Sequence, residues 1–128
     1  GVEDALIPSF KKYMEKVNRS RDISNADSIR IALQTALSDI DACESFYKSD
    51  VDNEYVILSE TGMAKVPAAF RKEFDAVLGE YPEVKYIKDG YDKFAFKLDV
   101  ESNTCTVYVT NGSDFVEISP DIDYDFYF

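Results

Sequence analysis

The sequence predicts an α+β domain in which a long N-terminal stem helix packs on a small antiparallel β-sheet, with one short extra helix. Three observations support this fold class. Apolar residues recur at every third or fourth position over residues 7–47, which is the pattern of one face of an α-helix. The last third of the chain has short apolar runs separated by turn signals such as Asp89-Gly90 and Asn111-Gly112, which are typical of antiparallel strands. The chain has 128 residues, 45% of them apolar, and this is enough for one domain with its own core.

The predicted long helix has two parts. From Ala26 to Tyr47 the apolar stripe is followed by enough sequence to cover it, so we expect this part to lie on the sheet. The whole run would be roughly 60 Å long, which exceeds the width of a domain of this size. We therefore predict a projecting stem at residues 1–21 and a globular head at residues 22–128. The apolar positions of the stem are Ile7, Phe10, Met14 and Val17.

The pattern loosens at the start of the head. Ser24, followed by Asp27 three residues later, resembles a helix N-cap. Either two helices meet there or one helix bends, and we favour one bent helix because no Gly or Pro interrupts the segment.

The middle of the chain predicts a second helix. Tyr55–Leu58 is a short apolar run that forms either a strand or a tucked connection, and Thr61-Gly62 predicts a turn. Pro67 then opens a helix over 68–78 that ends at Gly79. Its predicted buried side consists of Phe70, Phe74, Val77 and Leu78.

Several strands are predicted after this helix. The segment 84–88 leads into the turn at Asp89-Gly90, and the strands over 94–98 and 105–109 alternate between apolar and polar residues. A further apolar run covers 115–118. The last eight residues, 121–128, also alternate, which predicts an edge strand whose carboxylates discourage pairing with other sheets.

Charge and composition exclude several classes of function. The net charge is −11, and residues 49–128 carry seven Lys/Arg against seventeen Asp/Glu. An acidic head does not suit nucleic acid, whose phosphates need a basic surface. The chain has no histidine, no Gly-rich phosphate loop and no Cys-x-x-Cys motif, so the usual catalytic arrangements are missing. We therefore expect that the protein is not an enzyme.

The N-terminal third resembles the stem helix of type IV pilins and pseudopilins, most closely those of Gram-positive bacteria. The resemblance rests on IPSF at 7–10, KKYMEK at 11–16 and ISNADSIRIALQTALSD at 23–39. In that family a cleavable leader precedes an apolar helix, which spans the membrane or forms the filament core, and the second half of the helix packs on a small β-sheet. The leader and the apolar half do not occur in this sequence, so we expect a soluble domain that begins part-way along the stem.

The resemblance implies a structural subunit of a type IV pilus-like surface filament. Its partners would be copies of itself and other pilins, and its location extracellular or on the cell surface, with a precursor anchored in the membrane through the apolar segment. The assembly interface would comprise Ile7, Phe10, Met14 and Val17. We also expect Lys12 and Lys16 to meet the acidic heads of neighbouring copies. One alternative is a minor pseudopilin of a secretion or DNA-uptake machine. Another is a surface-anchored binding domain whose helix is a stalk and whose ligand face is rich in tyrosine (Tyr86, Tyr91, Tyr108 and Tyr127).

Two smaller sets of residues remain open. Cys43 falls on the apolar face of the long helix and Cys105 on the inward face of a strand, so they are either small core residues or a helix-to-sheet disulfide that would suit an extracellular location. Asp121, Asp123 and Asp125 are a candidate Ca²⁺ site, since alternate carboxylates supply the oxygen ligands that Ca²⁺ prefers. No Gly and Glu complete an EF-hand loop there, so we favour a simple acidic edge and expect no other cofactor.

Overall fold

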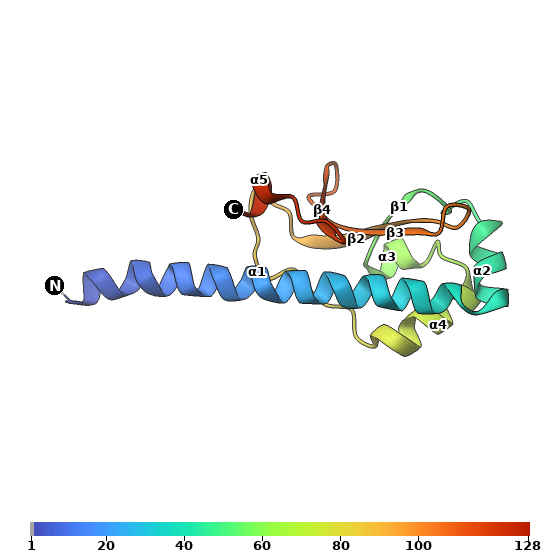
Figure 1. The fold of residues 1–128 in the computed structure, drawn as a ribbon, viewed down its shortest axis with the longest axis horizontal. Coiled ribbons are helices and arrows are strands. Elements are labelled where there is room, and N and C mark those ends of the chain that lie inside the picture. The colour runs from blue at the N-terminus through green and yellow to red at the C-terminus, as the bar shows by residue number, and fades with distance from the viewer. Residues whose placement is uncertain (1) are drawn as a thin grey trace.

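The predicted α+β class is confirmed by a computed structural model, which describes residues 2–128, with side chains from Ile7 onward. A long helix, α1 (Val2–Leu37), runs along the molecule, and a four-stranded antiparallel sheet lies against its second half (Figure 1). The sheet is a simple meander in which the strands follow one another in the order β1-β2-β3-β4. Its strands are β1 (Tyr55–Ile57), β2 (Lys93–Asp99), β3 (Thr104–Thr110) and β4 (Phe115–Ser119).

Helix α1 is continuous through the segment where the apolar pattern loosens. The expectation of one helix is therefore confirmed, but the expected bend is not, since Figure 1 shows no sharp kink at that point. Ser24 is not an N-cap, because its carbonyl lies inside the helix and accepts a hydrogen bond from the Ser28 hydroxyl at 3.2 Å. Along the described side chains, residues 7–16 are all exposed and Asp22 is the first that is buried.

The prediction that this helix continues to Tyr47 is wrong. Helix α1 ends at Leu37, and a separate helix, α2 (Ile40–Tyr47), starts in a new direction (Figure 1). The Asp39 side chain caps α2 by accepting a hydrogen bond from the Ala42 N–H at 2.9 Å. The restart changes the buried face, so Ala42 and Phe46 are buried whereas Ile40 and Tyr47 are exposed.

Two helices follow β1. Helix α4 (Ala68–Leu78) has the predicted bounds and ends at Gly79, whose φ of 74° is unfavourable for other residues. Its buried residues are Phe70 and Phe74, but Val77 is 46% exposed. The predicted Thr61-Gly62 turn is wrong, since both residues belong to the short helix α3 (Glu60–Met63), which Ser59 caps.

Gly62 predicts a strong effect of a single methyl group. A Cβ atom at this position would lie 2.0 Å from the Ile57 carbonyl oxygen, which is backbone and cannot rotate away. We expect Gly62→Ala to lower the free energy of unfolding by about 2–3 kcal/mol, in the range of overpacked core substitutions. Urea denaturation measures this loss, with the neighbouring exposed Thr61→Ala as the control. Equal stability of the two variants would contradict the expected clash.

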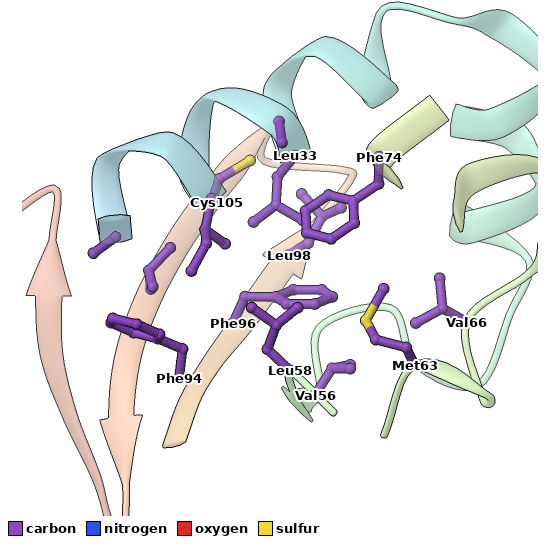
Figure 2. Close-up of a cluster of buried hydrophobic side chains, with 14 of the residues drawn as sticks. Leu33, Val56, Leu58, Met63, Val66, Phe74, Phe94, Phe96, Leu98 and Cys105 are labelled. Atoms are coloured by element: carbon purple, nitrogen blue, oxygen red, sulfur yellow. The ribbon is translucent and has the colours of Figure 1, made fainter. Parts of the chain in front are cut away.

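The core lies between the helices and the inner face of the sheet. Strand β2 contributes Phe94, Phe96 and Leu98, which are 0–1% exposed. Figure 2 shows Phe96 and Leu98 facing Leu33 of α1 and Phe74 of α4. Pairing in register extends this layer, since Phe96 lies opposite Val107 and Leu98 opposite Cys105 on β3. The predicted inward faces of the strands over 94–98 and 105–109 are thereby confirmed.

Residues 84–88 do not form the predicted strand. The Asp89-Gly90 turn is present, with positive φ at both residues, but it lies within an irregular segment that precedes β2. The reason lies in helix α1, because the backbone N–H groups of Lys85 and Tyr86 both donate to the Asp22 side chain rather than to a neighbouring strand.

The predicted C-terminal edge strand is also wrong. After β4, Pro120 cannot donate to a strand ladder, and the chain ends in the short helix α5 (Tyr124–Tyr127). The Asp123 carboxylate caps this helix by accepting from the Phe126 N–H at 3.1 Å. Tyr127, which was predicted to face outward, is 3% exposed.

Candidate functional site

The stem carries an apolar stripe that the head does not cover. Ile7, Phe10 and Tyr13 are 59–63% exposed, Met14 is 37% exposed, and Val17 is half-buried. At about 100° per residue these positions fall on one side of α1. Tyr13 is an addition to the predicted stripe, and its spacing from Phe10 and Val17 could have revealed it. Figure 1 shows this part of α1 projecting well beyond the sheet.

The other side of the stem helix carries three basic residues, Lys12, Lys16 and Arg19. Lys12 and Lys16 are one turn apart and both exposed, and the helical repeat places them roughly opposite Phe10. Nearer the head, the Arg19 guanidinium lies 3.9 Å from the Glu15 carboxylate. The stem therefore presents an apolar face and a cationic face to solvent.

Asp22 fastens the head to α1 where the stem ends. Its two carboxylate oxygens accept hydrogen bonds from the Lys85 N–H at 2.7 Å and the Tyr86 N–H at 2.8 Å. The residue is 0% exposed. Burial raises the pKa of this carboxyl, while the two N–H donors and the Lys85 charge act in the opposite direction.

The C-terminal segment packs on the same part of α1. The Arg19 guanidinium lies 5.2 Å from the centre of the Tyr86 ring and 5.4 Å from that of the Phe128 ring, which are cation–π distances. The Lys88 ammonium donates to the Phe126 carbonyl at 2.6 Å. We call Arg19, Asp22, Tyr86 and the segment 126–128 the stem–head junction.

The sequence alone did not predict this junction. One signal was available, since Asp22 stands at a position that shares the buried face with Ala26, Ile29 and Leu33. A carboxylate in the middle of an apolar face needs hydrogen-bond donors from another element. The partners could not have been identified, because they are more than sixty residues away in the chain.

The two cysteines, for which the sequence left open either core positions or a disulfide, are not joined in the structure. Cys43 and Cys105 are both free thiols in the structure; Cys43 is half-buried on α2, and Cys105 is buried on β3. Figure 2 shows Cys105 on the core side of the sheet, facing α1. Burial raises the pKa of the Cys105 thiol to about 11, so this group stays protonated at neutral pH.

The predicted carboxylate set is not brought together on one strand. Asp123 uses its side chain to cap α5, and Asp121 and Asp125 are exposed on either side of it. Over the residues that the structure describes, no three His, Cys, Asp or Glu side chains form a group that could hold a metal ion.

Of the four tyrosines predicted to form a ligand face, only Tyr108 faces outward from the sheet. Tyr127 is buried, while Tyr86 and Tyr91 are half-buried against the core. Tyr108 does face outward from the sheet, beside Tyr55 and Phe115. The Tyr55 ring stacks on Phe115 with the ring centres 3.9 Å apart, and it lies nearly perpendicular to the Tyr108 ring, with the centres 5.1 Å apart.

Comparisons with protein-family models, with curated protein sequences and with solved structures find no significant match to this chain. Among the described helices, none is long and apolar enough to cross a membrane.

Proposed function

We propose that this chain is a structural subunit of a surface filament of the type IV pilus kind, assembled through its N-terminal helix. The observation that carries the proposal is the exposed stripe of Ile7, Phe10, Tyr13 and Met14 on a helix that outruns its head (Figure 1). Contiguous apolar surface on a projecting element usually marks a protein interface. Helix α1 has 36 residues and is about 54 Å long, so several neighbouring stems could align along it.

The architecture supports the same proposal. The second half of α1 packs on an antiparallel sheet while its first half projects, as the resemblance to pilin stems implies (Figure 1). Asp22 and Arg19 hold the C-terminal segment and the loop over 84–86 against α1 at the point where it leaves the head. A firm junction at this point would transmit load from a filament core to the exposed heads.

The proposal is tested on filaments sheared from the surface of cells that produce the full-length protein. We expect mass spectrometry to find this chain in the filaments. N-terminal sequencing should show a processed end followed by a run of apolar residues. A chain that is absent from every surface filament, or that carries an ordinary secretion signal, would rule the proposal out. A minor pseudopilin would appear in small amounts beside a more abundant subunit.

The cationic side of the stem predicts a salt-dependent contribution to assembly. Lys12 and Lys16 would meet the acidic heads of neighbouring copies, so Lys12→Glu with Lys16→Glu should weaken assembly at low salt. The difference should shrink at about 1 M salt, where the screening length is about 3 Å. The matched control is Lys65→Glu with Lys72→Glu, which changes the charge equally on the head. Assembly that is the same for both pairs at low salt would sink this electrostatic role.

A further inference from the structure

A polar hollow lies on the face of the sheet that points away from the core. It encloses about 280 Å³ near the turn between β2 and β3. Its floor is formed by outward residues of these strands, including Asp99, Thr104 and Thr106, which alternate with buried core residues. Tyr108 and Asn53 also line the hollow.

Tyr108 is held in place by other aromatic rings. It lies nearly perpendicular to Tyr55, whose ring is stacked on Phe115, and the Lys97 ammonium lies 4.8 Å from the centre of the Tyr55 ring. Ala95, which pairs with Tyr108 in register, is 1% exposed although it points to the same outer side. The aromatic wall is therefore packed before any ligand arrives, which reduces the entropy lost on binding.

The hydrogen-bonding groups in the hollow suit a ligand rich in hydroxyls. Within the described part of the chain, the Asn53 amide and the Asp99 carboxylate make no side-chain hydrogen bond; Asn53 is exposed and Asp99 is half-buried. An amide both donates and accepts, and a carboxylate accepts from two hydroxyls at once. Threonine hydroxyls and an aromatic ring complete a site with convergent polar groups beside an apolar surface.

Charge narrows the class of ligand further. The ionisable pair that lines the hollow, Lys97 and Asp99, has formal charges that cancel, although residues 49–128 carry seven Lys/Arg against seventeen Asp/Glu. A phosphate or sulfate group would need a cationic cluster in place of a single lysine beside a carboxylate. A long apolar ligand would leave the Asn53 amide and the Asp99 carboxylate unpaired, whereas the Thr104 hydroxyl already bonds to that of Ser102. A neutral saccharide carries no charge, and it offers many hydroxyls together with an apolar ring face. It therefore suits both the cancelled charges and the polar lining of the hollow.

We propose that this hollow binds one unit of a neutral oligosaccharide, with Asn53 and Asp99 pairing with its hydroxyls and Tyr108 covering its ring. This binding is independent of the filament proposal, since the hollow lies on the head and includes no residue of the stem.

The test uses ¹H–¹⁵N NMR of the whole chain with cellotriose, mannotriose, chitotriose and lactose at about 10 mM each, above the roughly millimolar Kd of a shallow site. We expect at least one saccharide to shift the backbone amides of 53, 97–99 and 104–108. Asn53 has a φ of 58°, so Asn53→Gly keeps the backbone and removes only the amide. It should lower the affinity about tenfold, as the loss of a good hydrogen bond does.

Asn103→Gly is the matched control, because Asn103 has a φ of 55° and lies in the neighbouring turn outside the lining of the hollow. The affinity of Asn103→Gly for the saccharide should equal that of the unaltered chain. The proposal is overturned if none of the four saccharides shifts these amides, or if the two glycine variants bind equally well. If sodium sulfate shifts the same amides, and sodium chloride abolishes those shifts, the proposal is also overturned, since this would indicate an anion site.

Discussion

Replacing Asp22 by alanine is expected to lower the free energy of unfolding by about 2–5 kcal/mol, because it leaves two part-buried N–H groups without an acceptor, each at a cost of roughly 1–3 kcal/mol. Both donors, Lys85 N–H and Tyr86 N–H, lie within 2.8 Å of the carboxylate. Asp22→Asn should lower the free energy of unfolding by about half as much. The amide carbonyl oxygen still accepts one hydrogen bond, and no charge has to be buried.

Equilibrium urea denaturation measures the two losses. Asp50→Ala is the control, because Asp50 is an exposed aspartate in a turn and should change stability by no more than about 0.5 kcal/mol. Hydrogen exchange adds a local test, since the amides of Lys85 and Tyr86 should lose protection in Asp22→Ala more than those of β2 and β3. An Asp22→Ala variant that is as stable as Asp50→Ala would show that the junction contributes little.

The elements predicted well from the sequence are those in which burial imposes a simple period. The strand over 94–98 and the helix over 68–78 each have one face in the core, and Gly79 marks the end of that helix. The break after Leu37 was missed because the apolar spacing continues through Ile40, although Asp39 supplies the cap of a new helix. The Asp39 cap starts a new helix although the apolar spacing suggests a continuous one, and Ile40 is therefore exposed.

The C-terminal segment and the junction depend on contacts that are distant in sequence. Residues 121–128 alternate like a strand, but Asp123 caps a helical turn and Lys88 donates to the Phe126 carbonyl. The exposure of the stem was predictable, because a helix longer than its domain must project. The partners of Asp22 were not, since no local pattern connects α1 to the loop at 84–86.

Charging the apolar stripe of the stem is expected to abolish self-association without unfolding the head. Ile7 and Phe10 are 59% and 63% exposed, so Ile7→Asp with Phe10→Asp removes no core contact. Burying two such side chains between stems is worth about 3–6 kcal/mol, which corresponds to a more than hundredfold change in the association constant. The unfolding midpoint in urea should remain unchanged.

Sedimentation velocity over a concentration series decides this prediction. The matched control is Ile40→Asp with Tyr47→Asp, which places the same charges on exposed apolar residues of α2, at the other end of α1 (Figure 1). We expect the unaltered chain and the α2 pair to associate as concentration rises, while the stem pair stays monomeric. Because an apolar interface is strengthened by excluded salts such as sulfate, association through the stripe should increase in ammonium sulfate. Association that is equally weak in all three proteins would mean that the stripe does not bind a second stem, and that the filament proposal has lost its main support.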